Sequence, residues 1–183
     1  MVRALACMLV ASFAVSSVFA ADSECLQPGD AIGAFTVTKI AGPDDGVAVG
    51  ADLCYRCKYG SRPMVLVFAR NPDESLVELL HQLDEQVSKN ESSEFKGLLV
   101  MLGEDESALK DVSKKFAEKA KLSNVPVTVA SDYKSGPEAY KLSPEDELTV
   151  IVAKEGAVVA RHSGSAGKLD IEKVMGDVKT MLQ

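Results

Sequence analysis

Two cysteines, Cys54 and Cys57, are separated by two residues and are the strongest candidates for chemistry in this sequence. A Cys-X-X-Cys (CxxC) spacing brings two thiols close enough to form a reversible disulfide. Arg56, Lys58 and Arg62 supply positive charge beside the pair, which favours the reactive thiolate form of a cysteine. We therefore predict that Cys54 and Cys57 are catalytic: one thiolate attacks a partner disulfide, and the other resolves the mixed disulfide.

A static disulfide is the alternative interpretation of this pair, and Cys25 bears on it. Closing only four residues constrains the unfolded chain by about 2 kcal/mol in the loop-entropy description. A bridge from Cys25 to Cys54 or Cys57 closes about 30 residues and contributes roughly 3.6 kcal/mol. The short bridge would therefore stabilise the fold less than a bridge to Cys25. Either the pair is redox-active, or Cys25 exchanges with it, or the short disulfide is structural.

A metal site and a covalently attached haem are the other uses that such cysteines have. Tetrahedral zinc needs four ligands, and neither His81 nor His162 stands at a ligand spacing from the cysteines. A c-type haem needs a histidine directly after the second cysteine, where this sequence has Lys58. We therefore expect neither a metal nor another cofactor. We interpret His81 as a surface residue and His162 as a strand-end residue.

The strands that must position the cysteines are visible in the hydrophobic pattern. A continuous apolar run, Met64–Phe68, predicts a central strand buried on both faces, and the cysteines precede it in a loop. Further strands are predicted at Phe35–Ile40, Val47–Val49, Leu98–Leu102, Val125–Ala130, Leu148–Ala153 and Ala157–His162, of which the last two form a hairpin.

Apolar residues at helical spacing predict amphipathic helices between these strands. One helix is predicted over Pro72–Lys89, with Asn71 as its cap and Pro72 at the first helical position. Two more are predicted over Asp105–Lys121 and Ile171–Leu182, with a shorter helical turn at Gly136–Leu142.

The order of these elements predicts an α/β fold, because buried strands separated by helices imply parallel crossovers. Met64–Phe68 and Leu98–Leu102 should be adjacent, parallel and central. Several segments also have a familiar order and spacing: Pro28-Gly29 with Phe35, Met64–Arg70, Val125-Pro126-Val127 with Asp132, Ala139-Tyr140-Lys141-Leu142, and the hairpin Val150–Ser163. On these residues the chain resembles the thioredoxin-like superfamily, in its exported thioredoxin and peroxiredoxin-related branch. The resemblance covers roughly residues 29–182 and implies a thioredoxin-like mixed β-sheet flanked by helices.

The chain departs from this superfamily in two places. The resemblance implies a redox cysteine directly after the central strand, where the helix dipole would stabilise a thiolate, but Ala69–Glu74 contains no cysteine. It also implies a cis-proline immediately before the late hairpin, where Pro144 is followed by three acidic residues. The CxxC is thus displaced upstream of the central strand. We expect an activity unlike that of a typical peroxiredoxin.

The N-terminal residues Met1–Ala20 have the layout of a secretory signal: one positive charge, an apolar stretch and small residues before Ala21. We expect cleavage after Ala20, which removes Cys7 and leaves one thioredoxin-like domain over residues 21–183. The mature protein should be secreted or periplasmic and should not span a membrane, because no later apolar run has the length needed.

The charge of the chain restricts its partners. The formal net charge is −7, which excludes nucleic acid as a general partner because phosphates repel such a chain. A protein thiol or disulfide is the partner that the CxxC predicts. The alternative function is a redox-inactive thioredoxin-fold binding or scaffold domain with a structural disulfide. Arg70, at the end of the central strand, is interpreted either as a solvated strand-end residue or as a binder of an anion or partner carboxylate.

Overall fold

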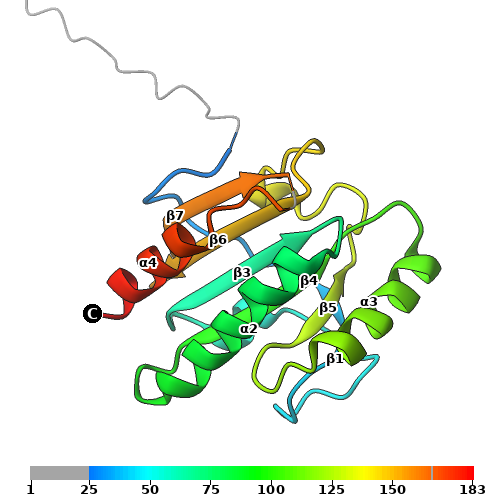
Figure 1. Cartoon of the computed structure of the whole chain (residues 1–183), viewed down its shortest axis with the longest axis horizontal. Helices are drawn as coiled ribbons and strands as arrows, with labels where there is room; N and C mark the ends of the chain where they lie inside the picture. The colour runs from blue at the N-terminus through cyan, green and yellow to red at the C-terminus, as the bar shows by residue number, and fades with distance from the viewer. Residues whose placement is uncertain (1–24, 166) are drawn as a thin grey trace, which may run out of the picture.

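The computed structural model describes residues 25–165 and 167–183, which Figure 1 colours from blue to red. The predicted signal peptide, residues 1–20, lies outside the described residues, as does Cys7. In the described chain, seven strands form one sheet in the order β2-β1-β5-β4-β3-β6-β7. The strands are β1 Val37–Ala41, β2 Asp52–Leu53, β3 Met64–Ala69, β4 Lys96–Met101, β5 Val127–Ala130, β6 Leu148–Lys154 and β7 Ala157–Gly164. The helices are α1 Tyr55–Tyr59, α2 Glu74–Lys89, α3 Glu106–Ala120 and α4 Ile171–Leu182, with 3-10 turns η1 Glu91–Ser93 and η2 Glu138–Tyr140.

β3 is the central strand that the sequence predicted, because its six residues are all apolar and all buried. It pairs in parallel with β4, where Leu66 lies opposite Leu98. On its other side it pairs antiparallel with β6, where Leu66 lies opposite Ile151. β6 and β7 form the predicted hairpin. The mixed sheet and the parallel, central pair β3 and β4 are therefore confirmed.

The start of α2 differs from the prediction. The Asp73 carboxylate accepts a hydrogen bond from Leu76 N at 3.0 Å, and the helix begins at Glu74. The side-chain amide of Asn71 instead donates to the Glu147 carboxylate at 3.3 Å. The predicted cap at Asn71 and start at Pro72 were wrong, because the Asn71 side chain is engaged with Glu147 while Asp73 accepts the N-cap hydrogen bond. Within residues 25–165 and 167–183 no helix has the length and apolar character needed for a membrane crossing.

The predicted strand at Val47–Val49 was also wrong. The backbone N–H of Val47 donates to the Asp45 carboxylate at 3.1 Å, and its carbonyl accepts from Lys39 Nζ at 3.0 Å. Because side chains occupy both groups, this backbone is not available to a neighbouring strand. The short strand β2, Asp52–Leu53, pairs antiparallel with β1 instead.

The sheet carries a hydrophobic core on each face, since successive side chains of a strand point to opposite sides. Figure 1 shows α2, α3 and α4 on one side of the sheet, where they pack with Val65 and Val67 of β3. The opposite core contains Leu66 and Phe68 together with side chains from α1, η2 and the chain before β1. The CxxC segment therefore lies on the face opposite α2.

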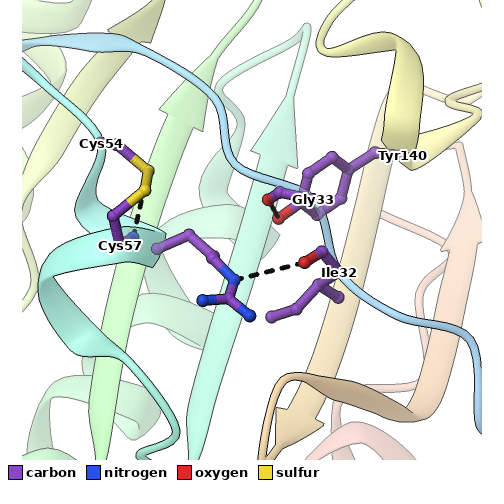
Figure 2. Close-up of a disulfide and its surroundings, with 6 residues drawn as sticks. Ile32, Gly33, Cys54, Cys57 and Tyr140 are labelled. Atoms are coloured by element: carbon purple, nitrogen blue, oxygen red, sulfur yellow. Dashed lines mark hydrogen bonds between the residues drawn. A yellow bond between two sulfur atoms is a disulfide. The ribbon is translucent and has the colours of Figure 1, made fainter.

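Aromatic contacts hold the chain before β1 against this second face. The ring of Phe35 lies 5.8 Å from that of Phe68 and 5.0 Å from that of Tyr140, measured between centroids. The Tyr140 hydroxyl donates to the Gly33 carbonyl at 2.8 Å, as Figure 2 shows. A Cβ at Gly33 would lie 2.7 Å from the Cβ of Ala139, so this close approach requires glycine.

Candidate functional site

Cys54 and Cys57 are joined by a disulfide, with their Cα atoms 5.2 Å apart (Figure 2). This separation lies within the ordinary range for bonded cysteines. The short bridge of four residues thus forms in place of either longer bridge to Cys25 that the sequence left open. Both sulfurs precede β3 in the chain, upstream of the central strand as predicted.

The sequence analysis placed the pair in a loop, but the structure places it at the start of a short helix. Cys54 is the N-cap of α1, and its Sγ accepts a hydrogen bond from the backbone N–H of Cys57 at 3.0 Å. Figure 2 shows this bond as a dashed line beside the disulfide. A five-residue helix is too short to show a hydrophobic period, which is why the sequence pattern missed it. The N–H donor is in place to stabilise negative charge on the Cys54 sulfur.

Two buried tyrosines anchor α1 to the sheet. Tyr55 is 1% exposed and Tyr59 is 5% exposed, and their ring centroids lie 5.4 Å apart. The Tyr59 hydroxyl donates to the carbonyl of Gly97, at the start of β4, at 3.1 Å. Burial raises the pKa of both phenols well above the usual value, so both stay protonated donors. The CxxC therefore belongs to a helix whose buried tyrosines fix it to the sheet.

A buried ionic network fixes the same helix from the side of β1. Lys39 is 1% exposed, and its ammonium donates to the Asp45 carboxylate at 2.8 Å and to the Pro43 carbonyl at 2.6 Å. The other carboxylate oxygen of Asp45 accepts from the Tyr55 hydroxyl at 2.8 Å. Burial acts to raise the pKa of Asp45, but hydrogen bonds from Lys39, Tyr55 and Val47 N, with the Lys39 charge, lower it overall.

The sequence analysis missed this network, although a signal for it was present. Phe35, Val37 and Lys39 alternate along the first predicted strand and share one face of it. A lysine in line with two inward-facing apolar residues requires a buried partner, because a lone buried ammonium is strongly unfavourable. The partner, Asp45, was interpreted only as part of a turn.

The positive residues beside the cysteines are largely engaged with other groups. Arg56 Nε donates to the Ile32 carbonyl at 3.2 Å, the bond drawn in Figure 2. Arg62 lies 3.0 Å from the Glu94 carboxylate and donates to the Tyr59 carbonyl at 3.2 Å. Lys58 is exposed. Of the three predicted charges, only that of Arg62 is paired with a carboxylate of the described chain, so Arg56 and Lys58 still supply positive charge near the pair, and the backbone N–H of Cys57 donates directly to a sulfur.

The edge after β3, where the resemblance implied a cysteine, is occupied by a structural arginine. Arg70 donates to the Lys134 carbonyl at 2.6 Å and to the Ser135 carbonyl at 3.3 Å. Its guanidinium thus ties the end of β3 to the loop after β5 at a partly exposed position, and the binding of an anion or partner carboxylate by Arg70 stays a prediction. No peptide bond in the described chain is cis, in line with the displaced position of Pro144.

Cys25 and the two histidines lie apart from α1. Cys25 lines a cavity of about 250 Å³ beside β7 and α4, together with His162 and Asp177. His162 Nε2 lies 2.8 Å from the Asp177 carboxylate, and His81 Nε2 lies 2.7 Å from the Ala120 carbonyl. His81 is exposed at the surface and His162 is on the final strand, as predicted. Among the described residues, no three His, Cys, Asp or Glu side chains cluster so that they could hold a metal ion.

Comparison with known proteins gives matches in structure alone. No protein-family model and no curated protein matches this sequence. The thioredoxin domain of a thiol-disulfide oxidoreductase from Bacteroides vulgatus is 15% identical, with a TM-score of 0.62 over 86% of this chain and 99% of that one. A secreted Mycobacterium tuberculosis disulfide oxidoreductase homologous to E. coli DsbE is 14% identical, with a TM-score of 0.56 over 80% and 95% of the two chains.

A peroxiredoxin-related neighbour matches as well. Mycobacterium tuberculosis AhpC is 14% identical, with a TM-score of 0.62 over 87% of this chain and 99% of that one. Identities this low establish the fold and leave the chemistry to be argued from the residues. The chain therefore has the thioredoxin-like α/β fold, a mixed seven-stranded sheet flanked by helices, with its CxxC disulfide upstream of the central strand.

Proposed function

We propose that this protein is a thiol-disulfide oxidoreductase that acts outside the cytoplasm through Cys54 and Cys57. The observation that carries the proposal is the disulfide at the start of α1, whose Cys54 sulfur already accepts the Cys57 N–H. A donor directed at one sulfur stabilises the thiolate that forms when the disulfide opens. Two of the structural neighbours are themselves thiol-disulfide or disulfide oxidoreductases, which supports the same chemistry here.

The reaction moves two electrons without any cofactor. A partner thiolate attacks one sulfur of the Cys54–Cys57 disulfide, a mixed disulfide forms, and the other cysteine leaves as a thiolate. A second partner thiolate then attacks the mixed disulfide and releases the oxidised partner, so the protein ends as a dithiol. The reverse sequence reduces a partner disulfide. The anchoring of α1 by Tyr55 and Tyr59 keeps the two sulfurs adjacent in both forms.

We propose that the protein is exported, which makes an oxidising environment available to the cysteine pair. The layout of residues 1–20 is that of a cleaved signal. Of the structural neighbours, the Mycobacterium tuberculosis disulfide oxidoreductase is described as secreted. Proteins with exposed thiols or disulfides are the partners that such an environment supplies.

A static bridge in a binding or scaffold domain is the competing function, and one observation favours it. The edge after β3 lacks a cysteine and is closed by the bonds from Arg70 to Lys134 and Ser135. The two functions differ in reduction potential, since structural disulfides lie below about −300 mV. The function proposed here requires a potential above that value.

The test is a redox titration of the folded protein against glutathione, together with insulin reduction. We expect the wild-type pair to equilibrate with glutathione and to reduce insulin slowly. The double variant Cys54→Ser/Cys57→Ser should lose all activity yet remain folded, because a four-residue bridge contributes only about 2 kcal/mol to stability. Cys25→Ser is the matched control and should retain the activity. Full activity in the double variant, or a pair that resists reduction, would refute the proposal.

A further inference from the structure

The two residues of the pair differ in exposure. Cys57 is exposed, and it is followed by the exposed Lys58. Cys54 is half-buried, and it lies in the chain between Leu53, which packs against the second core, and Tyr55, which is 1% exposed. An attacking thiolate must approach along the line of the S–S bond, so the more exposed residue of the pair is the easier one to attack.

The two sulfurs also differ as leaving groups. When Cys57 is attacked, the S–S bond breaks and the electron pair goes to Cys54, whose Sγ accepts the Cys57 N–H at 3.0 Å. When Cys54 is attacked, the electron pair goes to Cys57, for whose sulfur no such backbone donor is found in the described residues. A more stable thiolate leaves faster. Accessibility and leaving-group stability therefore favour the same direction.

On these grounds we infer that Cys57 is the sulfur that bonds to the partner and that Cys54 is the resolving sulfur; this rests on the proposed function. In the oxidising direction, a partner thiolate bonds to Cys57 and Cys54 leaves as a thiolate. In the reducing direction, Cys57 attacks the partner disulfide, and Cys54 then attacks Cys57 Sγ and releases the reduced partner. Every mixed disulfide thus passes through Cys57, the second cysteine of the motif.

Fixing Cys54 by its neighbours suits the resolving role. The Cys54 sulfur is held 3.0 Å from the Cys57 amide, on a half-buried residue whose own backbone continues from β2 into α1. It therefore stays within reach of Cys57 while a bulky partner is attached there.

The experiment maps the mixed disulfide with glutathione as the probe, in a Cys25→Ser background that keeps the pair. Oxidised protein is mixed with reduced glutathione and quenched with N-ethylmaleimide, and the adducts are located by mass spectrometry. We expect glutathione on Cys57 and N-ethylmaleimide on Cys54, in at least about tenfold excess over the reverse arrangement. Glutathione on Cys54, or an even distribution, overturns the inference.

Variants with a single thiol of the pair test which cysteine bonds to the partner, without requiring turnover. Cys54→Ser leaves only Cys57 of the pair, and serine keeps the capacity to cap α1. Cys57→Ser leaves only Cys54. With glutathione disulfide as the probe, at an alkaline pH where both single thiols are ionised, the Cys54→Ser variant should form its adduct at least about ten times faster than the Cys57→Ser variant, because Cys57 is the more exposed residue. Equal or reversed rates would refute the assignment, whereas failure of the wild-type pair to exchange refutes the proposed oxidoreductase function instead.

Discussion

At the scale of single residues, the site depends on side chains that carry no sulfur. Tyr55 is the residue after Cys54, and its hydroxyl reaches Asp45, which in turn holds the buried ammonium of Lys39. This arrangement couples the first turn of α1 to the middle of β1. The position of the Cys54 sulfur is thus set by a charge pair that lies 15 and 9 residues before it in the chain.

We predict that Asp45→Ala destabilises the protein by about 3 kcal/mol, because it leaves the Lys39 ammonium buried without its counter-charge. The predicted loss of stability lies at the low end of the range for a broken buried ion pair, because the Asp45 side chain is 19% exposed. Urea unfolding followed by circular dichroism measures the change. Asp44→Ala, at the exposed neighbouring position, is the matched control and should change stability by less than about 0.5 kcal/mol. Equal effects of the two variants would contradict the role given to the network.

At the scale of elements, long or continuous apolar patterns predicted the structure well. The run Met64–Phe68 predicted β3 because a strand buried on both faces leaves no polar position. The 3.6-residue period predicted α2, α3 and α4 because each buries one stripe of apolar side chains. Tertiary contacts determine the segments that the hydrophobic pattern did not predict correctly. The helix α1 is too short to show a periodicity, and the backbone of Val47 bonds to the side chains of Asp45 and Lys39 instead of pairing in a strand.

The place of the cysteine pair upstream of β3 could be predicted from the sequence, whereas the geometry around the pair could not, and its catalytic role stays a prediction. The cysteine spacing alone identified the pair and its position upstream of β3. The capping bond from the Cys57 amide and the unequal exposure of the two cysteine residues depend on where Tyr55 and Tyr59 find their partners. Those partners, Asp45 and Gly97, are distant in sequence, so spacing could not reveal them.

We predict that Leu66→Asp in β3 costs several kcal/mol, because it buries a carboxylate at a position with 0% exposure between β4 and β6. Thermal unfolding measures the loss, and the variant should melt far below the wild type or fail to fold. Val159→Asp on β7, where the side chain is 39% exposed, serves as the control. Wild-type-like melting of Leu66→Asp would contradict the central position of β3.

At the scale of the whole molecule, the mature protein is expected to be one acidic domain released from its signal. We predict that N-terminal sequencing of secreted material begins at Ala21, or within one or two residues of it. The reason is the run of small residues that ends the apolar stretch before this position. Material that keeps Met1–Ala20 and sediments with membranes would contradict export in soluble form.

The two faces of the sheet are covered by layers of very different length. α2, α3 and α4 have 16, 15 and 12 residues, whereas the opposite face is covered by a helix of five residues, a 3-10 turn of three and extended chain. Short segments held by a few side chains open at lower free energy than long helices. Partial unfolding should therefore begin in the layer that carries the disulfide, while β3 and the three long helices stay folded. The backbone amides of α1 would then exchange their hydrogens with solvent before those of β3, while the rest of the domain remained native.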